Sequence, residues 1–466
     1  MRLPYRCAWL VLLLAGCPDG GNEDDTSTSF GTPTGTDSGG TESSSVDPGT
    51  SSSGDVEETS TTGNGCTAGQ LGCECLPEEE CDPGLVCDAG TCQDEGGDTT
   101  EGDDTTTTGP DPVCGNDMPE PGLLCFGTAM PQAMAAGTIG ITIANFDASP
   151  FLDIVTANRD ANSVAIRLGQ ADGQFGSQDE YPTGTGPIAI GSGQFVGDEN
   201  LDVVTLNLTS LDVSILAGTA TEDFEAPLNI SLGIAPLTPT DLEVVDLEDD
   251  GDADILVTES TGSAIHVIRF EKGAALPIDT YPVGGGPTAI HAADFSGNMV
   301  PDVITANGAG GTVSLLLGNG LGQLGEPTSA TAGTSPNGAS SGDFNGDDTL
   351  DAILSNPGGT VTIRLGNGLG GFGGQLPFPI AGGSPTALVA ADFNLDGITD
   401  VAVSTSENNV HVLVGNGSGN LTEEAVIAVG ETPDDIVAAD LNDDGMLDIV
   451  TANISAGGVS VILTDA

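Results

Sequence analysis

The sequence of 466 residues contains 70 Asp and Glu but only 7 Lys and Arg, which gives a formal net charge of −63 at pH 7. This charge excludes the basic surface that nucleic-acid binding requires, and it makes attraction to anionic lipid headgroups equally unfavourable. The length allows a large core and more than one domain, while the acidic balance fits a protein that binds hard cations or simply a soluble exported surface.

The first 16 residues have the pattern of an export signal. Arg2 and Arg6 precede an apolar segment, residues 8–15, that is too short to span a bilayer as a helix. The sequence LAGC at residues 14–17 resembles the bacterial lipobox, which implies that Cys17 becomes the lipidated first residue of the mature protein. Several acyl chains would then anchor the protein without a transmembrane helix. An ordinary secretory signal with an incidental cysteine is the alternative.

The residue after Cys17 favours one membrane over the other. It is Pro18, whereas an Asp at this position is associated with retention in the inner membrane of enteric bacteria. We therefore expect an exported protein that is lipid-anchored to the outer membrane or cell surface of a Gram-negative bacterium, with no other membrane contact.

Two linkers flank a small cysteine-rich module. Residues 17–64 and 94–112 consist mostly of Gly, Ser, Thr, Asp, Glu and Pro, so we predict that they are disordered. Six cysteines in an exported segment as short as residues 65–93 predict three disulfides, with fifteen possible connectivities. They are Cys66, Cys73, Cys75, Cys81, Cys87 and Cys92. A zinc site is the alternative, and the absence of His in this segment counts against it.

Residues 113–466 contain seven copies of one unit. Nine-residue windows that resemble DFNLDGITD, residues 392–400, recur at steps of 48–52 residues, and a proline stands seven residues before six of them. The windows begin at Asn145, Gln194, Asp246, Asp294, Asp343, Asp392 and Asp440. Each is followed by two short apolar strands, such as DVITAN and VSLLLG. With one strand entering the window and another near a QFG or GFG element, each unit has about four predicted strands.

Four strands at this period predict an all-β fold, a seven-bladed β-propeller with four-stranded blades. A stacked solenoid is the alternative. The chain ends at Ala466 soon after VSVILT, so the last unit lacks its outer strand. Residues 123–134 supply a matching segment, because Phe126 and Phe175 each lie 19 residues before a window. We therefore predict that residues 123–134 complete the seventh blade and cover its edge.

Cys114 and Cys125 lie beside this closing segment. They are the only cysteines of the mature chain outside the module and Cys17, so we predict that they form a disulfide. The bridge would fasten the closure of the ring.

The repeats resemble the FG-GAP/VCBS family, the repeat of integrin α-chain propellers and of many bacterial surface proteins. The resemblance rests on QFG…GTGP at residues 174–187, on GFG…GGSP at residues 371–385 and on the acidic windows. It extends over residues 123–466 and implies binding or adhesion at the cell surface.

The windows have the donor spacing of a calcium loop. Calcium takes six to eight oxygen ligands, which a tight loop can supply from positions 1, 3, 5 and 9 and from the carbonyl of position 7. Position 9 begins the next strand, so the metal would fix a turn between two strands. Four windows have oxygen donors at all four side-chain positions and at least three carboxylates among them: Asp246, Glu248, Asp250 and Asp254; Asp343, Asn345, Asp347 and Asp351; Asp392, Asn394, Asp396 and Asp400; Asp440, Asn442, Asp444 and Asp448.

The other windows are weaker. Two have fewer carboxylates: Asp294, Ser296, Asn298 and Asp302; Asn145, Asp147, Ser149 and Asp153. Val196 at position 3 cannot ligate, so we predict that the window at Gln194 has lost its site. Position 6 is Gly in three windows but Asp348 in another, which must then adopt a left-handed conformation. We expect Ca²⁺ at four good and two weak sites; side chains that only cap turns are the alternative, and Mg²⁺ fits less well.

The sequence shows no convergent acid, base and nucleophile, so we expect no catalysis. The three histidines, His266, His291 and His411, lie in different units, and we expect His266 and His411 at a strand surface. No G-x-S-x-G motif and no free cysteine is present. A lectin is the second class of function, disfavoured because the only Trp, Trp9, lies in the export signal. A hydrolase or lyase that uses the propeller channel is the third. We expect a monomer that binds a protein or glycan at the cell surface.

Overall fold

The computed structural model describes residues 85–88, 91–94, 124–198, 200–219, 223–233 and 237–464. The predicted signal peptide with Cys17, the linkers apart from Asp94, the other cysteines up to Cys81, and Cys114 lie outside the described residues. The chain divides into two units. In the smaller unit the described part is a hairpin, in which β1 (Leu85–Asp88) pairs with β2 (Thr91–Asp94).

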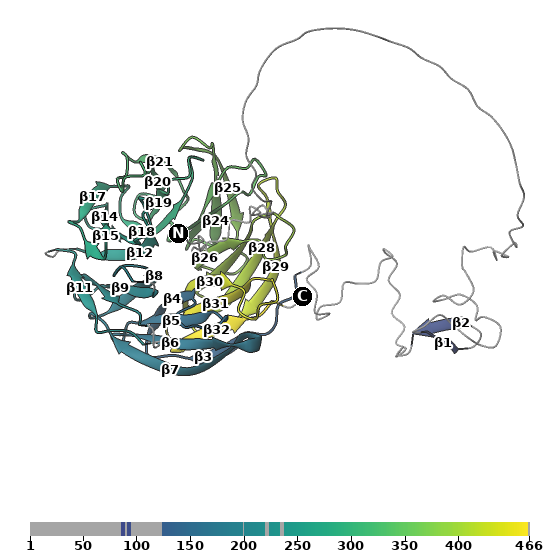
Figure 1. The fold of residues 1–466 in the computed structure, drawn as a ribbon. Helices are drawn as coiled ribbons and strands as arrows, with labels where there is room; N and C mark the ends of the chain where they lie inside the picture. The colour runs from purple at the N-terminus through teal and green to yellow at the C-terminus, as the bar shows by residue number, and fades with distance from the viewer. Residues whose placement is uncertain are drawn as a thin grey trace, which may run out of the picture. The chain divides into compact units, whose positions relative to one another are not determined.

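The larger unit is a ring of seven antiparallel sheets of four strands each, so the predicted seven-bladed propeller is confirmed (Figure 1). In each blade the strands follow one another outward from the centre of the ring. The strands of the first four blades are β4 (Thr138–Ala144), β5 (Asp153–Asn158), β6 (Ser163–Gln170) and β7 (Gln174–Pro182); β8 (Pro187–Gly193), β9 (Asp202–Asn207), β10 (Asp212–Leu216) and β11 (Leu228–Ser231); β12 (Pro239–Val245), β13 (Asp254–Glu259), β14 (Ala264–Ile268) and β17 (Asp279–Pro282); β18 (Pro287–Ala293), β19 (Asp302–Asn307), β20 (Thr312–Leu316) and β21 (Thr328–Thr331).

The other three blades have the same order. Their strands are β22 (Gly338–Gly342), β23 (Asp351–Asn356), β24 (Thr360–Gly366) and β25 (Phe372–Pro379); β26 (Pro385–Ala391), β27 (Asp400–Thr405), β28 (Asn409–Gly415) and β29 (Leu421–Ala428); β30 (Pro433–Ala439), β31 (Asp448–Asn453), β32 (Gly458–Ile462) and β3 (Met130–Ala133). A small hairpin of β15 (Phe270–Glu271) and β16 (Ala274–Ala275) extends the third blade, and η1 (Ala171–Gly173) is a single 3-10 turn. No helix among the described residues is long and apolar enough to cross a membrane.

The seventh blade is completed by the segment that precedes the first blade. Its outer strand is β3, which pairs with β32 from Met130 opposite Val461 to Ala133 opposite Gly458, as predicted. The first strands of adjacent blades contact one another around the whole ring, including β30 with β4. Cys125 is buried and disulfide-bonded. Its predicted partner, Cys114, lies outside the described residues, so that pairing stays a prediction.

The core of the ring lies between the blades. The second strand of every blade is buried along its whole length, because the adjacent blades cover both of its faces. Its apolar run therefore shows no alternation. Seven apolar clusters result, one at each junction between neighbouring blades. The fully buried Phe195, Phe344 and Phe393 stand at position 2 of their windows and anchor the loops to these clusters.

Candidate functional site

The seven acidic windows connect the first and second strands of their blades, so they lie on one face of the ring. Five of them share a backbone with left-handed residues at positions 4 and 6; they begin at Asp246, Asp294, Asp343, Asp392 and Asp440. Where position 6 is glycine, position 4 is another residue, as in Leu395 (φ 55°) before Gly397 (φ 81°). Where position 6 is not glycine, position 4 is, as in Gly346 (φ 74°) before Asp348 (φ 62°). Asp348 is thus left-handed as predicted, and one glycine per loop suffices.

The first aspartate of these five loops holds the turn together. In the loop at Asp392, the N–H of Asp396 donates to Oδ1 at 3.2 Å and the N–H of Gly397 donates to Oδ2 at 2.8 Å. The same two bonds, from positions 5 and 6, recur in the other four loops. They keep the carboxylate inside the turn, where a cation would need it.

The carboxylate at position 9 has a structural role that the spacing did not reveal. Asp400 accepts the N–H of Phe393 on Oδ2 at 3.2 Å and the N–H of Gly415 on Oδ1 at 2.8 Å. Its burial is complete and raises its pKa to about 7. The same pair of acceptors recurs in all seven blades, at Asp153, Asp202, Asp254, Asp302, Asp351, Asp400 and Asp448. Position 9 therefore ties the loop to the end of the third strand, even in the second blade, where no metal is expected.

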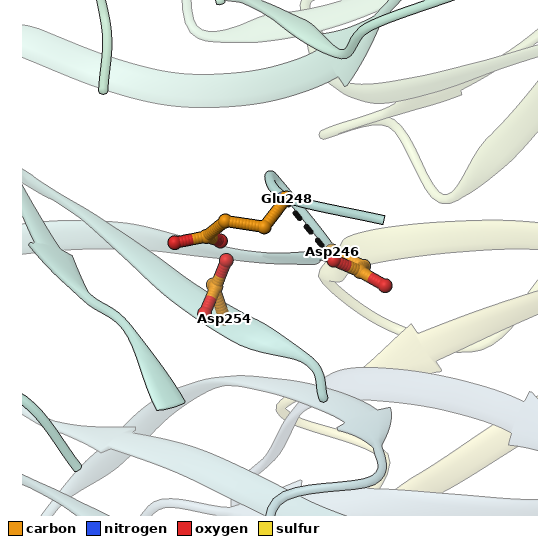
Figure 2. Close-up of side chains that lie close together, drawn as sticks. All are labelled: Asp246, Glu248 and Asp254. Atoms are coloured by element: carbon orange, nitrogen blue, oxygen red, sulfur yellow. Dashed lines mark hydrogen bonds between the residues drawn. The ribbon is translucent and has the colours of Figure 1, made fainter. Parts of the chain in front are cut away.

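One loop gathers three acidic side chains. An oxygen of each of Asp246, Glu248 and Asp254 lies within 4.8 Å of the other two (Figure 2). Burial, together with the neighbouring Glu248 carboxyl, raises the pKa of Asp254 well above its usual range. Arg269 offsets part of the negative charge, because it donates to Glu248 at 3.1 Å and to Asp279 at 3.2 Å.

The remaining predicted ligands are less closely gathered. Asp250, at position 5 of the same loop, is exposed and is not one of the three. No other loop within the described ranges brings three acidic side chains this close. In two loops the asparagine at position 3 instead donates to the carboxylate at position 5: Asn394 to Asp396 at 3.1 Å and Asn442 to Asp444 at 3.0 Å.

The first two loops depart from the shared form. Pro150 stands at position 6 of the loop at Asn145, and its ring excludes the left-handed conformation. In the loop at Gln194 the apolar Val196 offers only its N–H, which donates to the position 9 carboxylate of Asp202 at 3.1 Å. The loop at Asp294 has few carboxylates but keeps the shared backbone. From the sequence the loops at Asn145 and Asp294 were expected to be equally weak, but only the loop at Asp294 keeps the shared backbone.

Each acidic loop lies beside the hairpin between the third and fourth strands of the next blade. A Cβ on Gly322 (φ 71°) would lie 2.0 Å from Glu248 Oε1, so this hairpin lies directly against the Glu248 side chain. Three apolar side chains protrude from these loops and hairpins: Met299, Leu321 and Leu369 are 92%, 70% and 83% exposed. The acidic loops, these hairpins and their apolar tips are called the loop face below.

The first strands carry polar side chains that join neighbouring blades, and the sequence analysis did not single them out. Asp241 accepts the N–H of Ile290 at 3.0 Å, and Asp435 accepts the N–H of Ile141 at 3.0 Å. Each carboxylate satisfies an N–H of the next blade's first strand, which is the inner edge of its sheet. In the sequence, both residues could have been recognised as a carboxylate two residues after the proline of the unit.

Replacing Asp241 with asparagine is expected to stabilise the protein at pH 8 more than at pH 5. Burial raises the pKa of Asp241 to about 7, so the folded protein keeps a proton that the unfolded chain releases near pH 4. This contribution to stability is present at low pH and is lost as the pH rises through 7. Asparagine keeps the acceptor for Ile290 without the charge. At about 1.4 kcal/mol per pKa unit, reduced for partial exposure, the variant should gain about 2 kcal/mol over the wild type between pH 5 and pH 8.

Urea unfolding at several pH values, in the presence of a chelator, measures this difference. The exposed Asp172→Asn variant is the control and should track the wild type at every pH. A difference between Asp241→Asn and wild type that does not change with pH would contradict the prediction.

A second polar group on the first strands contains a histidine, a carboxylate and a hydroxyl. His291 in β18 places Nε2 3.0 Å from Ser341 Oγ in β22 and Nδ1 3.7 Å from Glu243 Oε1 in β12. An acid, a base and a hydroxyl therefore converge from three successive blades. No such convergence was expected from the sequence, because the three residues are about 50 positions apart and belong to different repeats.

The other two histidines are not surface residues of the strands as expected. His411 is 2% exposed, and its Nδ1 lies 3.1 Å from Glu423 Oε2. His266 is half-buried, with Nδ1 3.0 Å from Thr280 Oγ1. The expectation was wrong because the third strands are covered by the adjacent blades.

Tyr181 and Tyr281 pack into the blade junctions. Tyr181 contacts Phe224 edge-on, with ring centroids 5.2 Å apart, and donates to Asp223 at 2.9 Å. Tyr281 packs against the junction of the third and fourth blades. Neither presents the open ring face on which a sugar would stack.

The acidic loops fit a hard divalent cation. Their donors are all oxygen atoms, the ligand type that calcium takes, and the three gathered carboxylates repel one another until a cation or proton lies between them. Asp246, Glu248, Asp250 and Asp254 would hold Ca²⁺ in the third blade. In the other loops, except the one at Gln194, the side chains at positions 1, 3, 5 and 9 would do so.

The fold and these loops define a class of protein, the seven-bladed propeller with an acidic loop between the first two strands of its blades. Residues 343–403 and 392–451 match the sequence model of the FG-GAP-like repeat. This part of the ring therefore consists of FG-GAP-like repeats. The sequence has no match among curated proteins.

Solved propellers share the fold at low sequence identity. The chain resembles BBS1N, solved in complex with ARL6DN and soaked with lead, at a TM-score of 0.53 and 15% identity, covering 73% of this chain and 96% of that one. It resembles a streptogramin B lyase at a TM-score of 0.50 and 15% identity, covering 73% of this chain and 98% of that one. At these identities the likeness shows the fold alone.

Proposed function

We propose that the protein is a calcium-stabilised binding protein of the cell surface, which presents its loop face to a ligand. The observation that carries this proposal is the set of five loops with one backbone, one hydrogen-bond scheme and oxygen donors on a single face. The FG-GAP-like repeats support a propeller of the binding type. Lipidation of Cys17 attaches the chain to the outer membrane.

The loop face favours a protein ligand over a glycan. Met299, Leu321 and Leu369 are exposed apolar tips among carboxylates, which suits a partner with small apolar pockets and a basic rim. A glycan would stack on aromatic rings, and both mature tyrosines are packed in the blade junctions.

Calcium is expected to raise the melting temperature of the protein, and Asp250→Asn is expected to reduce that rise. A ligand that binds only the folded state stabilises it by about 2.7 kcal/mol at a concentration of one hundred times its Kd. Asp250 is a predicted ligand at position 5 of the loop with three gathered carboxylates, so its replacement weakens this site. Thermal unfolding followed by circular dichroism, with calcium, with magnesium and with chelator, measures the effect.

Asp249→Asn is the matched control. Asp249 is the exposed neighbour of Asp250, occupies position 4 with φ 58°, and is not a predicted ligand. Asparagine tolerates this conformation, so the variant removes the same charge without removing a ligand. Equal loss of the calcium effect in both variants would mean that the loops attract cations only by their charge. No calcium effect in the wild type would overturn the proposal.

A further inference from the structure

We propose that Ser341 is a nucleophile, with His291 as its general base and Glu243 as the residue that positions His291, and that it reacts with uncharged or cationic carboxylic esters. This activity goes beyond the proposed binding function and uses a different part of the ring. The geometry that points to it is the convergence of the three side chains on the inner strands β12, β18 and β22.

The distances match the roles. Ser341 Oγ lies 3.0 Å from His291 Nε2, within the range of a nucleophile and its base. Glu243 Oε1 lies 3.7 Å from His291 Nδ1, which is close enough for an ion pair but longer than a hydrogen bond. Glu243 is itself held, because the same oxygen accepts the N–H of Ala292 at 3.3 Å. Burial lowers the pKa of His291 to about 4, so its imidazole is neutral and can accept the proton of Ser341.

The register also supplies a donor for an oxyanion. Ala292 stands two residues before Asp294, opposite Val303, and its N–H points away from its own sheet toward Glu243. Ser341 stands two residues before Asp343, opposite Ala352, so its N–H faces the same way. This N–H lies beside the Oγ of the same residue, as an oxyanion donor must.

The three side chains are partly exposed, and the negative charge around them favours uncharged or cationic substrates. The side chains of His291 and Glu243 are 13% and 26% exposed, and Ser341 is half-buried. All three stand two or three residues before an acidic loop, so they lie near the loop face. The carboxylates of these acidic loops repel anionic substrates.

The reaction balances without any further reagent. Ser341 Oγ bonds to the ester carbonyl carbon while its proton passes to His291 Nε2, and that proton then goes to the leaving alkoxide as the carbon–oxygen bond breaks. Water reverses the sequence: its oxygen bonds to the acyl carbon, its proton passes through Nε2, and Oγ leaves and is reprotonated. The products are a carboxylic acid and an alcohol.

A fluorophosphonate with an uncharged tag tests the proposal on the full chain. Ser341 Oγ is expected to displace fluoride and keep the phosphonyl group. Cleavage before aspartate releases residues 302–342 as one peptide, in which fragment ions locate the modified serine. An adduct on Ser341 supports the proposal. An adduct on any other serine, or none, overturns it even if every variant fails to fold.

Matched variants separate the roles. Ser341→Ala should abolish labelling, whereas Ser340→Ala, its neighbour on β22, should leave it unchanged. His291→Gln can still hydrogen-bond Ser341, and should slow labelling by about 10²- to 10⁴-fold because it cannot take the proton. Circular dichroism confirms that each variant is folded. Equal labelling of His291→Gln and wild type would overturn the role of the base.

Glu243 is tested by the pH profile. Its pKa is raised to about 8 by burial and by Asp241, so the ionised form, which attracts His291 Nδ1–H electrostatically, prevails only above that pH. The titratable groups that face it are Asp241 on its own strand and His291 on β18, and β8 on its other side carries none. Labelling should quicken between pH 7 and pH 9 in the wild type but not in Glu243→Gln. The same profile in both would overturn the positioning role.

Discussion

Asp400→Ala is expected to destabilise the propeller by roughly 2–6 kcal/mol even in the presence of a chelator. The carboxylate is shielded from solvent and accepts two backbone N–H groups, from Phe393 and Gly415. Each buried N–H left without an acceptor costs about 1–3 kcal/mol. Asp400→Asn keeps one acceptor oxygen, so its loss should be about half as large. Urea unfolding with chelator present measures the three proteins.

Asp396→Ala in the same loop is the control for this prediction. Its carboxylate is exposed, and it accepts one backbone N–H, from Ile398, and one side-chain N–H, from Asn394. Without calcium it should therefore cost less than about 1 kcal/mol. With calcium present it should also lose the stabilisation due to its loop. If Asp400→Ala were harmless in chelator, position 9 would not be the structural link described above.

Removing β3 is expected to have the largest effect on the fold. A chain that begins at residue 135 lacks the strand that covers β32, whose residues are all buried. The exposed edge would pair with other copies, and the junctions of the seventh blade would lose Leu124, Phe126 and Met130. Because whole proteins are stable by only about 5–15 kcal/mol, we expect this chain to unfold or aggregate.

A chain that begins at residue 113 is the matched control, since it keeps β3 and should remain folded and monomeric. Size-exclusion chromatography and circular dichroism distinguish the two chains. A synthetic peptide of residues 124–134, added during refolding, should restore the shorter chain. If the shorter chain were monomeric with an unchanged melting temperature, the closure of the ring through β3 would be dispensable.

Two activities on one ring would be experimentally separable. The acidic loops lie between the first and second strands, whereas Ser341, His291 and Glu243 lie on the first strands. A calcium effect without labelling of Ser341 would leave a binding propeller. Labelling without a calcium effect would leave an esterase whose acidic loops are held by their own hydrogen bonds.

The overall fold was predictable from the sequence because a propeller is periodic. The repeated windows, the buried runs such as DVITAN and the outer-strand segment near Phe126 each reflect local chemistry that returns once per blade. Closure of the ring was predictable because the last unit lacks its outer strand and residues 123–134 supply a matching segment. The left-handed glycines were also predictable in part, although the exchange of glycine between positions 4 and 6 was not.

The loop residues show where the spacing was insufficient. It placed Asp400 and Asp396 together as ligands of one kind, because both are oxygen donors at the right positions. Only the packed structure shows that Asp400 is buried against two N–H groups while Asp396 is exposed. Packing likewise brings Asp246, Glu248 and Asp254 close together, whereas Asp250 is not part of this group.

The sequence by itself determined the number of blades, the order of their strands and the placement of the acidic loops between two strands. The tertiary structure alone decided which side chains meet between blades. His291 stands three residues before its loop and meets Ser341, which stands two residues before the next, so contact depends on a one-residue stagger between adjacent inner strands. Within one repeat nothing encodes this stagger, because it is set by how whole blades pack around the ring.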